Sequence, residues 1–105
     1  SLRDENFQHT VPELSKFVET TKDYALGIRL GKQEVKHFPD KDLPYVDLGN
    51  YYMMAGDTIN AIENWEIAYD KFKGNKNIAA TLYNYFKEKG NTEKAEYYLR
   101  EYGSD

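Results

Sequence analysis

A period of 34 residues runs through the second half of the chain and limits the folds open to it. Seven pairs of residues 34 positions apart match in kind, small with small and apolar with apolar. The pairs are Leu48 and Leu82, Tyr52 and Phe86, Gly56 and Gly90, Asp57 and Asn91, Thr58 and Thr92, Ala61 and Ala95, and Trp65 and Leu99. A period of this length is typical of units that stack on one another, because one unit alone leaves its apolar face open.

Each unit predicts two helices joined by a tight turn. Apolar residues recur at three- and four-residue spacing before the turn and again after it, which is one face of an α-helix. Gly56 and Gly90 supply the left-handed residue that ends a helix. Asp57 and Asn91 follow at once, and their side chains can cap the next helix. The apolar residues are Tyr45, Leu48 and Tyr52, then Ile59, Ile62, Trp65, Ala68, Tyr69 and Phe72, and in the next unit Leu82, Tyr85 and Phe86, then Ala95, Tyr98, Leu99 and Tyr102.

The same register extends, less well, into the first part of the chain. Subtracting 34 from Asp57 gives Asp23, another candidate cap, and subtracting 34 from Ala61 gives Gly27. Lys22 stands where the later units carry the turn glycine. Thr10 and Glu13 form a capping box at the expected start of this unit. We therefore interpret the first unit as a divergent repeat.

These patterns predict an all-α protein of about six antiparallel helices. The expected helices span residues 10–22, 24–37, 43–55, 58–72, 76–89 and 92–102. They form a single domain over residues 1–105, with a divergent repeat at 8–41 and further repeats at 42–75 and 76–105. The sequence is also consistent with a segment of a larger protein.

The stretch from Tyr45 to Lys73 resembles a tetratricopeptide repeat, whose pattern is W-x2-L-G-x2-Y, then A-x3-F and a proline. Lys73-Gly74 replaces the terminal proline, so we expect glycine to end that helix, and Tyr83 replaces the glycine in the third unit. The resemblance implies a short right-handed stack of about three helix–turn–helix repeats, with Trp65 filling the space between close helices. The matching residues are Tyr45, Leu48, Gly49, Tyr52, Ala61, Trp65 and Ala68, and in the third unit Leu82, Phe86, Gly90, Ala95 and Leu99.

In tetratricopeptide proteins the first helices of successive repeats line a groove that takes an extended peptide or a partner helix. The resemblance therefore implies a non-catalytic protein-interaction or scaffold module with a protein or peptide as partner. Our candidate contact residues are Asn50, Met54, Asn84 and Lys87. The wider face comprises Val46 and Met53, then Asn77, Ala80, Thr81 and Glu88, and in the first unit Pro12, Lys16, Glu19 and Thr20.

Simpler interpretations of these residues stay open. Asn50 and Asn84 are 34 residues apart and can bond a peptide backbone, but they also suit a solvated helix face. Met54 suits either a binding surface or the core. The family's clamp for a C-terminal carboxylate uses cations, and Val46 and Ala80 stand one turn before the two asparagines instead.

An alternative function rests on the last helix. Tyr98, Leu99 and Tyr102 form an apolar stripe there, and a helical stack needs a polar cap at its end. The alternative is an accessory or dimerisation domain that packs through this helix against a larger, even catalytic, protein or a second copy. Ten tyrosines cannot all be buried. Some therefore either form contact surfaces or fill partly solvated spaces between helices.

Other classes of function find little support in the sequence. A net charge of −4 without a basic stripe argues against nucleic-acid binding. No run of about 18 apolar residues predicts a membrane span. The chain has no cysteine, and His9 and His37 lie far apart, so we expect no metal or cofactor site and no enzyme activity.

Overall fold

The computed structural model describes residues 10–73 and 75–104, and this part of the chain is all-α. Six helices make up nearly all of it, and no strand occurs among these residues. The helices are α2 (Thr10–Thr21), α3 (Tyr24–His37), α4 (Leu43–Met54), α5 (Thr58–Phe72), α6 (Lys76–Glu88) and α7 (Thr92–Gly103). Every helix agrees with its predicted span to within one residue at each end, which confirms the all-α prediction.

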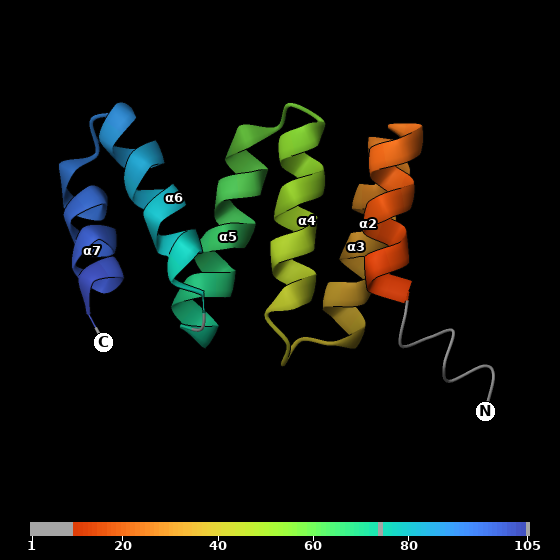
Figure 1. Ribbon diagram of the computed structural model, residues 1–105, viewed down its shortest axis with the longest axis horizontal. Helices are drawn as coiled ribbons and strands as arrows, with labels where there is room; N and C mark the ends of the chain where they lie inside the picture. The colour runs from red at the N-terminus through yellow and green to blue at the C-terminus, as the bar shows by residue number, and fades with distance from the viewer. Residues whose placement is uncertain (1–9, 74, 105) are drawn as a thin grey trace.

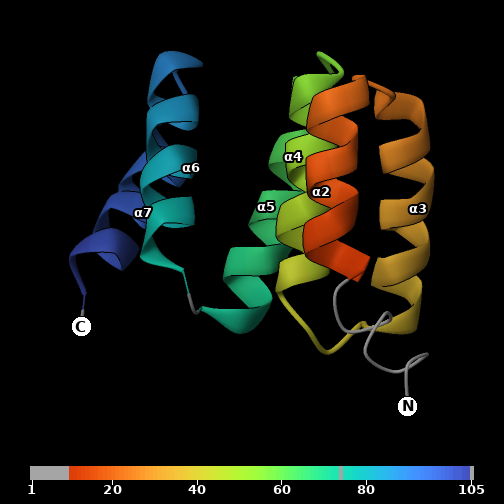
Figure 2. The same cartoon turned by 45° about the vertical axis from the view of Figure 1, so that its right-hand side comes forward.

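The helices form three hairpins that follow one another along the long axis of the molecule (Figures 1 and 2). The pair α2 and α3 lies at one end, α4 and α5 in the middle, and α6 and α7 at the other end. The molecule measures 47 × 29 × 20 Å. Within residues 10–73 and 75–104, each hairpin therefore contacts its sequence neighbour, and each outer hairpin has a neighbouring hairpin on one side only.

The turn inside each hairpin has the same backbone conformation. Gly56 and Gly90 have φ angles of 86° and 79°, in the left-handed region that glycine adopts without strain. Lys22, at the equivalent position of the first hairpin, has a φ of 60° although it is not glycine. The residue after each of them caps the next helix, as predicted: the side chains of Asp23, Asp57 and Asn91 accept hydrogen bonds of 3.1, 3.2 and 3.2 Å from backbone N–H groups. The repeat thus extends into the first hairpin at the level of the backbone.

The other helix boundaries differ in part from the expectation. The helix α5 ends at Phe72 and is capped by Lys73, whose φ of 57° lies in the left-handed region, whereas we expected a glycine to end this helix. The carbonyl of Tyr69 accepts a hydrogen bond from the Lys73 N–H at 2.7 Å, and this bond holds the cap in place. Gly74 and the side chains of the Thr10–Glu13 capping box lie outside the described part of the chain.

Small residues bring the helices of a hairpin and of neighbouring hairpins close together. Ala61 and Ala95 are buried, as expected at close helix contacts. A Cβ atom on Gly49 would overlap the indole ring of Trp65, so α4 and α5 touch at this point. The Trp65 Nε1–H donates a 3.1 Å hydrogen bond to the Val46 carbonyl, which fixes the ring across the two helices. Trp65 is partly buried, as its predicted role between close helices requires.

Two glycines of the first hairpin also allow close packing. A Cβ on Gly27 would lie 2.7 Å from a methyl group of Val18, and a Cβ on Gly31 would lie 3.2 Å from the ring of Tyr51. Both glycines are buried. The face of α3 that carries both glycines can therefore pack closely against α2 and α4.

The residues of the predicted apolar stripes are buried or partly buried except for Ile59, Leu99 and Tyr102, which are exposed. Ile59 was expected in the stripe of α5, yet it is 68% exposed, because it lies on the opposite side of the helix from Ala61 and Ala68. Tyr98 was expected on the open stripe of α7, yet it is 2% exposed and packs edge-on against Tyr69 at a ring distance of 6.0 Å. The open residues of α7 are Leu99 and Tyr102 alone among the three predicted there.

Some tyrosines are buried in the core, and others are partly buried at its edge. Tyr51, Tyr52, Tyr69 and Tyr98 are buried. A second group, only partly buried, lies against the main core cluster: Tyr45, Tyr83, Tyr85 and Tyr97. Most of the tyrosine rings therefore fill spaces between helices, and the hydroxyls of Tyr69, Tyr97 and Tyr98 bond polar side chains.

Candidate partner-binding surface

A pocket of about 220 Å³ opens where the middle and last hairpins meet, and we call it the groove pocket. It lies on the face that the resemblance assigns to the first helices of the repeats. Its walls come from α4, α5 and α6, so neither hairpin forms it alone. The lining residues are Val46, Asn50, Trp65, Asn77, Ile78 and Thr81.

The chemistry of the groove pocket is an apolar floor with free amides at its rim. Val46, Trp65 and Ile78 supply carbon atoms, and the Trp65 N–H is already bonded to the Val46 carbonyl. The side chains of Asn50 and Asn77 are exposed and make no hydrogen bond to any residue in 10–73 and 75–104. Each amide can therefore donate to and accept from a ligand at the same time.

The structure places the four candidate contact residues at different distances from this pocket. Asn50 lines it. Met54, half-buried on α4, and Asn84 and Lys87, both exposed on α6, are outside its lining. The Lys87 ammonium lies 5.5 Å from the centre of the Tyr83 ring, which holds it over its own helix. Asn77 and Thr81, which belong to the wider predicted face, do line the pocket.

A larger hollow of about 580 Å³ runs along the outer side of α5. One helix supplies all of its lining residues, so it is a shallow depression rather than a cleft between elements. Glu66 pairs with Lys94 at 2.9 Å, and Asp70 accepts a hydrogen bond from the hydroxyl of Tyr98. Two of its acidic residues are therefore already occupied by α7.

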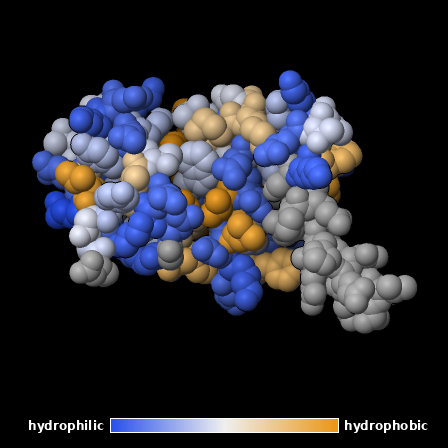
Figure 3. Space-filling model, viewed as in Figure 1, coloured by the Kyte–Doolittle hydropathy of each residue, from blue (hydrophilic) through white to orange (hydrophobic). Residues whose placement is uncertain are grey.

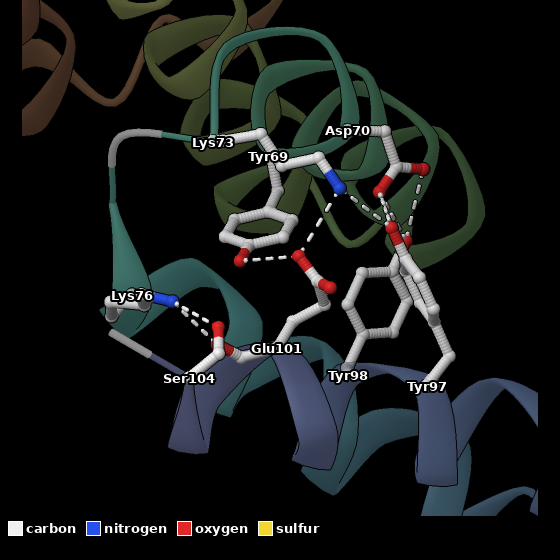
Figure 4. Close-up of polar contacts among 8 residues, drawn as sticks. All are labelled: Tyr69, Asp70, Lys73, Lys76, Tyr97, Tyr98, Glu101 and Ser104. Carbon is white, nitrogen blue, oxygen red and sulfur yellow. Dashed lines mark hydrogen bonds and ion pairs between the residues drawn. The ribbon is translucent and has the colours of Figure 1, made fainter.

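The middle and last hairpins are joined on this outer side by a set of polar side chains, which we call the tyrosine network (Figure 4). Its residues are Tyr69, Asp70, Lys73, Tyr97, Tyr98 and Glu101. The Glu101 carboxylate accepts a 3.0 Å hydrogen bond from the Tyr69 hydroxyl and a 3.1 Å bond from the Lys73 ammonium. The Tyr98 hydroxyl lies 3.2 Å from both oxygens of Asp70. The network thus bonds α5 to α7 at several points.

Electrostatics in the tyrosine network favour the charged forms of its ion pair. The hydrogen bond from Lys73, with help from Tyr69, lowers the pKa of Glu101. Hydrogen bonds to Tyr97 and Glu101 raise the pKa of Lys73. Burial, followed by the negative charge of Asp70, raises the pKa of Tyr98, so its hydroxyl keeps its proton as a donor.

A second acidic site lies between the first and middle hairpins. The Oδ2 atom of Asp47 on α4 is buried and has no hydrogen-bond partner. Burial and the nearby charge of Glu34 on α3 raise the pKa of Asp47 to about 6. Burial also raises the pKa of Glu34. The ionised pair therefore opposes the packing of α3 against α4 at neutral pH.

This pair gives the protein a measurable dependence on pH. Because the folded-state pKa of Asp47 exceeds its unfolded value of 3.8, stability is highest below that value and falls as the pH rises through about 6. We expect Asp47→Asn to raise the free energy of unfolding at pH 7 by about 1 kcal/mol, a figure reduced for the partial exposure of the side chain. Urea titrations of both proteins between pH 4 and pH 8 measure the difference.

The control for this prediction is Glu34→Gln. Removing the Glu34 charge should lower the pKa of Asp47 and move the fall in stability to lower pH. A stability difference between Asp47→Asn and the parent chain that stays the same from pH 4 to pH 8 would contradict the assignment to Asp47.

Potential metal ligands are not gathered together among the described residues. In the part of the chain that the structure describes, no group of three His, Cys, Asp or Glu residues is arranged to hold a metal ion. His37 is exposed in the last turn of α3, and His9 lies outside the described residues. Among the helices of residues 10–73 and 75–104, none has the length and apolar character needed to cross a bilayer.

Comparison with known proteins adds no relative to this picture. No protein-family model matches the chain, and searches of curated proteins and of solved structures find no match either. The case for its family and its function therefore rests on the residues and contacts described above.

Sequence reasoning missed part of this surface. Ile78 was not among the predicted face residues, and Trp65 was expected only between the helices, yet both line the groove pocket. The spacing of Trp65 predicted its burial but not the opening beside it, and Ile78 was in none of the predicted stripes. The tyrosine network was also not anticipated, because no short spacing connects Tyr69 to Glu101 in the sequence.

Proposed function

We propose that this chain is a tetratricopeptide-like helical-repeat domain that acts as a non-catalytic protein-interaction or scaffold module. Three features support the family. The residues of the pattern recur at a spacing of 34 residues, and three hairpins follow one another along the chain. All three hairpins share a left-handed turn followed by an Asp or Asn cap. In that family the first-helix face is where peptides bind, and the groove pocket opens on the corresponding helices α4 and α6.

The partner we propose is an extended peptide that inserts one aliphatic side chain into the groove pocket. At about 220 Å³ the pocket is smaller than the usual range for small-molecule sites, which favours a single side chain over a cofactor. The free amides of Asn50 and Asn77 can then bond the peptide backbone on either side of that side chain. This pairing of an apolar floor with unbonded amides is the observation that carries the proposal.

Peptide binding can be tested with a library of fluorescent 12-residue peptides, followed by titration of the best binder. We expect Asn50→Ala and Asn77→Ala each to weaken binding about 5- to 10-fold, because each removes about 1 to 1.5 kcal/mol of hydrogen bonding. Asn84→Ala is the matched control, since Asn84 is exposed on α6 but does not line the groove pocket. A larger loss for Asn84→Ala than for the other two would place the binding site elsewhere.

The terminus of the peptide gives a further test. The described residues that line the groove pocket include no cation, so they offer a free C-terminal carboxylate no charged partner. Amidation of the peptide's C-terminus should therefore change the affinity by less than about 2-fold. Binding that requires the free carboxylate would show that the site is a carboxylate clamp after all.

A further inference from the structure

We propose that copies of this chain associate head to tail, with the α2 end of one molecule packing on the α7 end of the next. The proposal concerns the two ends of the row of hairpins and does not depend on the groove pocket. Within the molecule, certain repeat positions of one hairpin contact the hairpin that follows it. At the α7 end the residues in those positions have no following hairpin among the described residues. Residues at the other end occupy the positions that pack against the preceding one.

The first of these ends, the tail surface, consists of Ala80 on α6 with Leu99 and Tyr102 on α7. Leu99 and Tyr102 are each 50% exposed. The residues 34 positions before these three, in the middle hairpin, are Val46, Trp65 and Ala68.

Those three earlier residues meet the last hairpin inside the molecule. Val46 and Trp65 line the groove pocket together with Ile78 of α6. Ala68 is 2% exposed in the core cluster that also contains Ile78. The tail surface is thus the repeat equivalent of an interface already formed once in this chain.

The second end, the head surface, comprises Phe17 of α2, which is 47% exposed, and Leu30 of α3, which is partly buried. The equivalents of Phe17 in the later hairpins are Tyr51 and Tyr85. Tyr51 is 1% exposed and lies against Gly31 of the preceding hairpin. The equivalent of Leu30 in the last hairpin is Tyr98, which is buried against Tyr69 of the preceding hairpin.

The head and tail surfaces are therefore the two sides of the same kind of interface. Figure 1 shows that they lie at opposite ends of the long axis, so one molecule cannot bring its own two surfaces together. The head surface of a second copy can pack on the tail surface of the first, with the same repeat positions in contact as between neighbouring hairpins inside one molecule. Such a contact joins two different surfaces, and it therefore continues into short open chains rather than closing as a dimer.

Apolar character is otherwise scattered over the surface. The face shown in Figure 3 is mostly hydrophilic, and its hydrophobic colour is broken into small areas. Ile59 on the middle hairpin is more exposed than Phe17, Leu99 or Tyr102. Because it belongs to neither end, Ile59 is a matched control for non-specific hydrophobic association.

Sedimentation velocity of the 105-residue chain at concentrations up to about 1 mM measures this association, since small interfaces give weak binding. We expect the weight-average mass to rise steadily with concentration. Phe17→Asp on the head surface and Leu99→Asp on the tail surface should each hold the chain at the monomer mass, and Ile59→Asp should leave the rise unchanged. Circular dichroism checks that each variant keeps its helices, and Tyr102→Asp provides a second tail variant.

Mixing the two variants gives the decisive result. A Phe17→Asp molecule keeps an intact tail and a Leu99→Asp molecule keeps an intact head, so an equimolar mixture should form dimers that grow no further. Three results would overturn the proposal: a parent chain that stays monomeric, a mixture that stays monomeric, or an Ile59→Asp variant that abolishes association as fully as Leu99→Asp.

Discussion

Replacing Gly49 by valine should lower the free energy of unfolding by about 3 kcal/mol. A side chain at this position would overlap the indole of Trp65, which lies directly across from α4. The ring would have to move, and the hydrogen bond from Trp65 Nε1 to the Val46 carbonyl would be lost. Chemical denaturation followed by far-UV circular dichroism measures the change.

The control for this substitution is Gly103→Ala. No atom of the described residues lies within 4 Å of a Cβ placed on Gly103, and its φ is not in the left-handed region. Alanine there should leave stability within about 0.5 kcal/mol of the parent or raise it slightly. If Gly49→Val proves as harmless as Gly103→Ala, the close contact between α4 and α5 does not exist in solution.

Replacing Tyr98 by alanine should cost about 3 to 5 kcal/mol, because it empties a large buried site between the last two hairpins. The ring is 2% exposed, and it stacks on Phe86 at 6.0 Å as well as meeting Tyr69 edge-on. The comparison variant is Tyr98→Phe, which keeps the ring and removes only the hydroxyl bonded to Asp70. That variant should cost about 1 to 2 kcal/mol. Thermal and urea unfolding of the three proteins gives both differences.

The pair of Tyr98 variants separates packing from hydrogen bonding in the tyrosine network. Equal losses for Tyr98→Ala and Tyr98→Phe would mean that the hydroxyl, not the ring, holds α7 to α5. A small loss for both would mean that Tyr98 is not buried at this interface in solution.

The helices and their turns could be predicted from the sequence because local signals define them. Gly56 and Gly90 need no tertiary contact to adopt a left-handed conformation, and Asp57 and Asn91 cap the helices that follow them directly. The 34-residue period then placed the same turn at Lys22, where no glycine marks it. Local chemistry and periodicity agree over most of the chain, which is why the helix boundaries were accurate.

Features that depend on how the hairpins pack against one another could not be predicted from the sequence. Ile59 falls within a plausible helical stripe three residues before Ile62, but it lies on the opposite side of α5 from the buried Ala61, and only the packing of the hairpins shows which side faces the core. The Oδ2 atom of Asp47 is buried and the charge of Glu34 on α3 acts on it, and the sequence neighbours of Asp47 give no sign of either. The groove pocket likewise depends on the separation of α4 and α6, so the sequence indicated Asn50 and Asn77 as surface residues but not the hollow between them.

Lys22 has a consequence for how units of this kind should be compared. A lysine in the left-handed region costs more than glycine would, yet here it produces the same chain reversal and is followed by the same capping aspartate. A consensus motif that demands glycine at this position would therefore discard the first hairpin, whereas a criterion based on dihedral angles would retain it. In this chain the positive φ angle at the turn identifies equivalent hairpins more consistently than the type of residue at that position does.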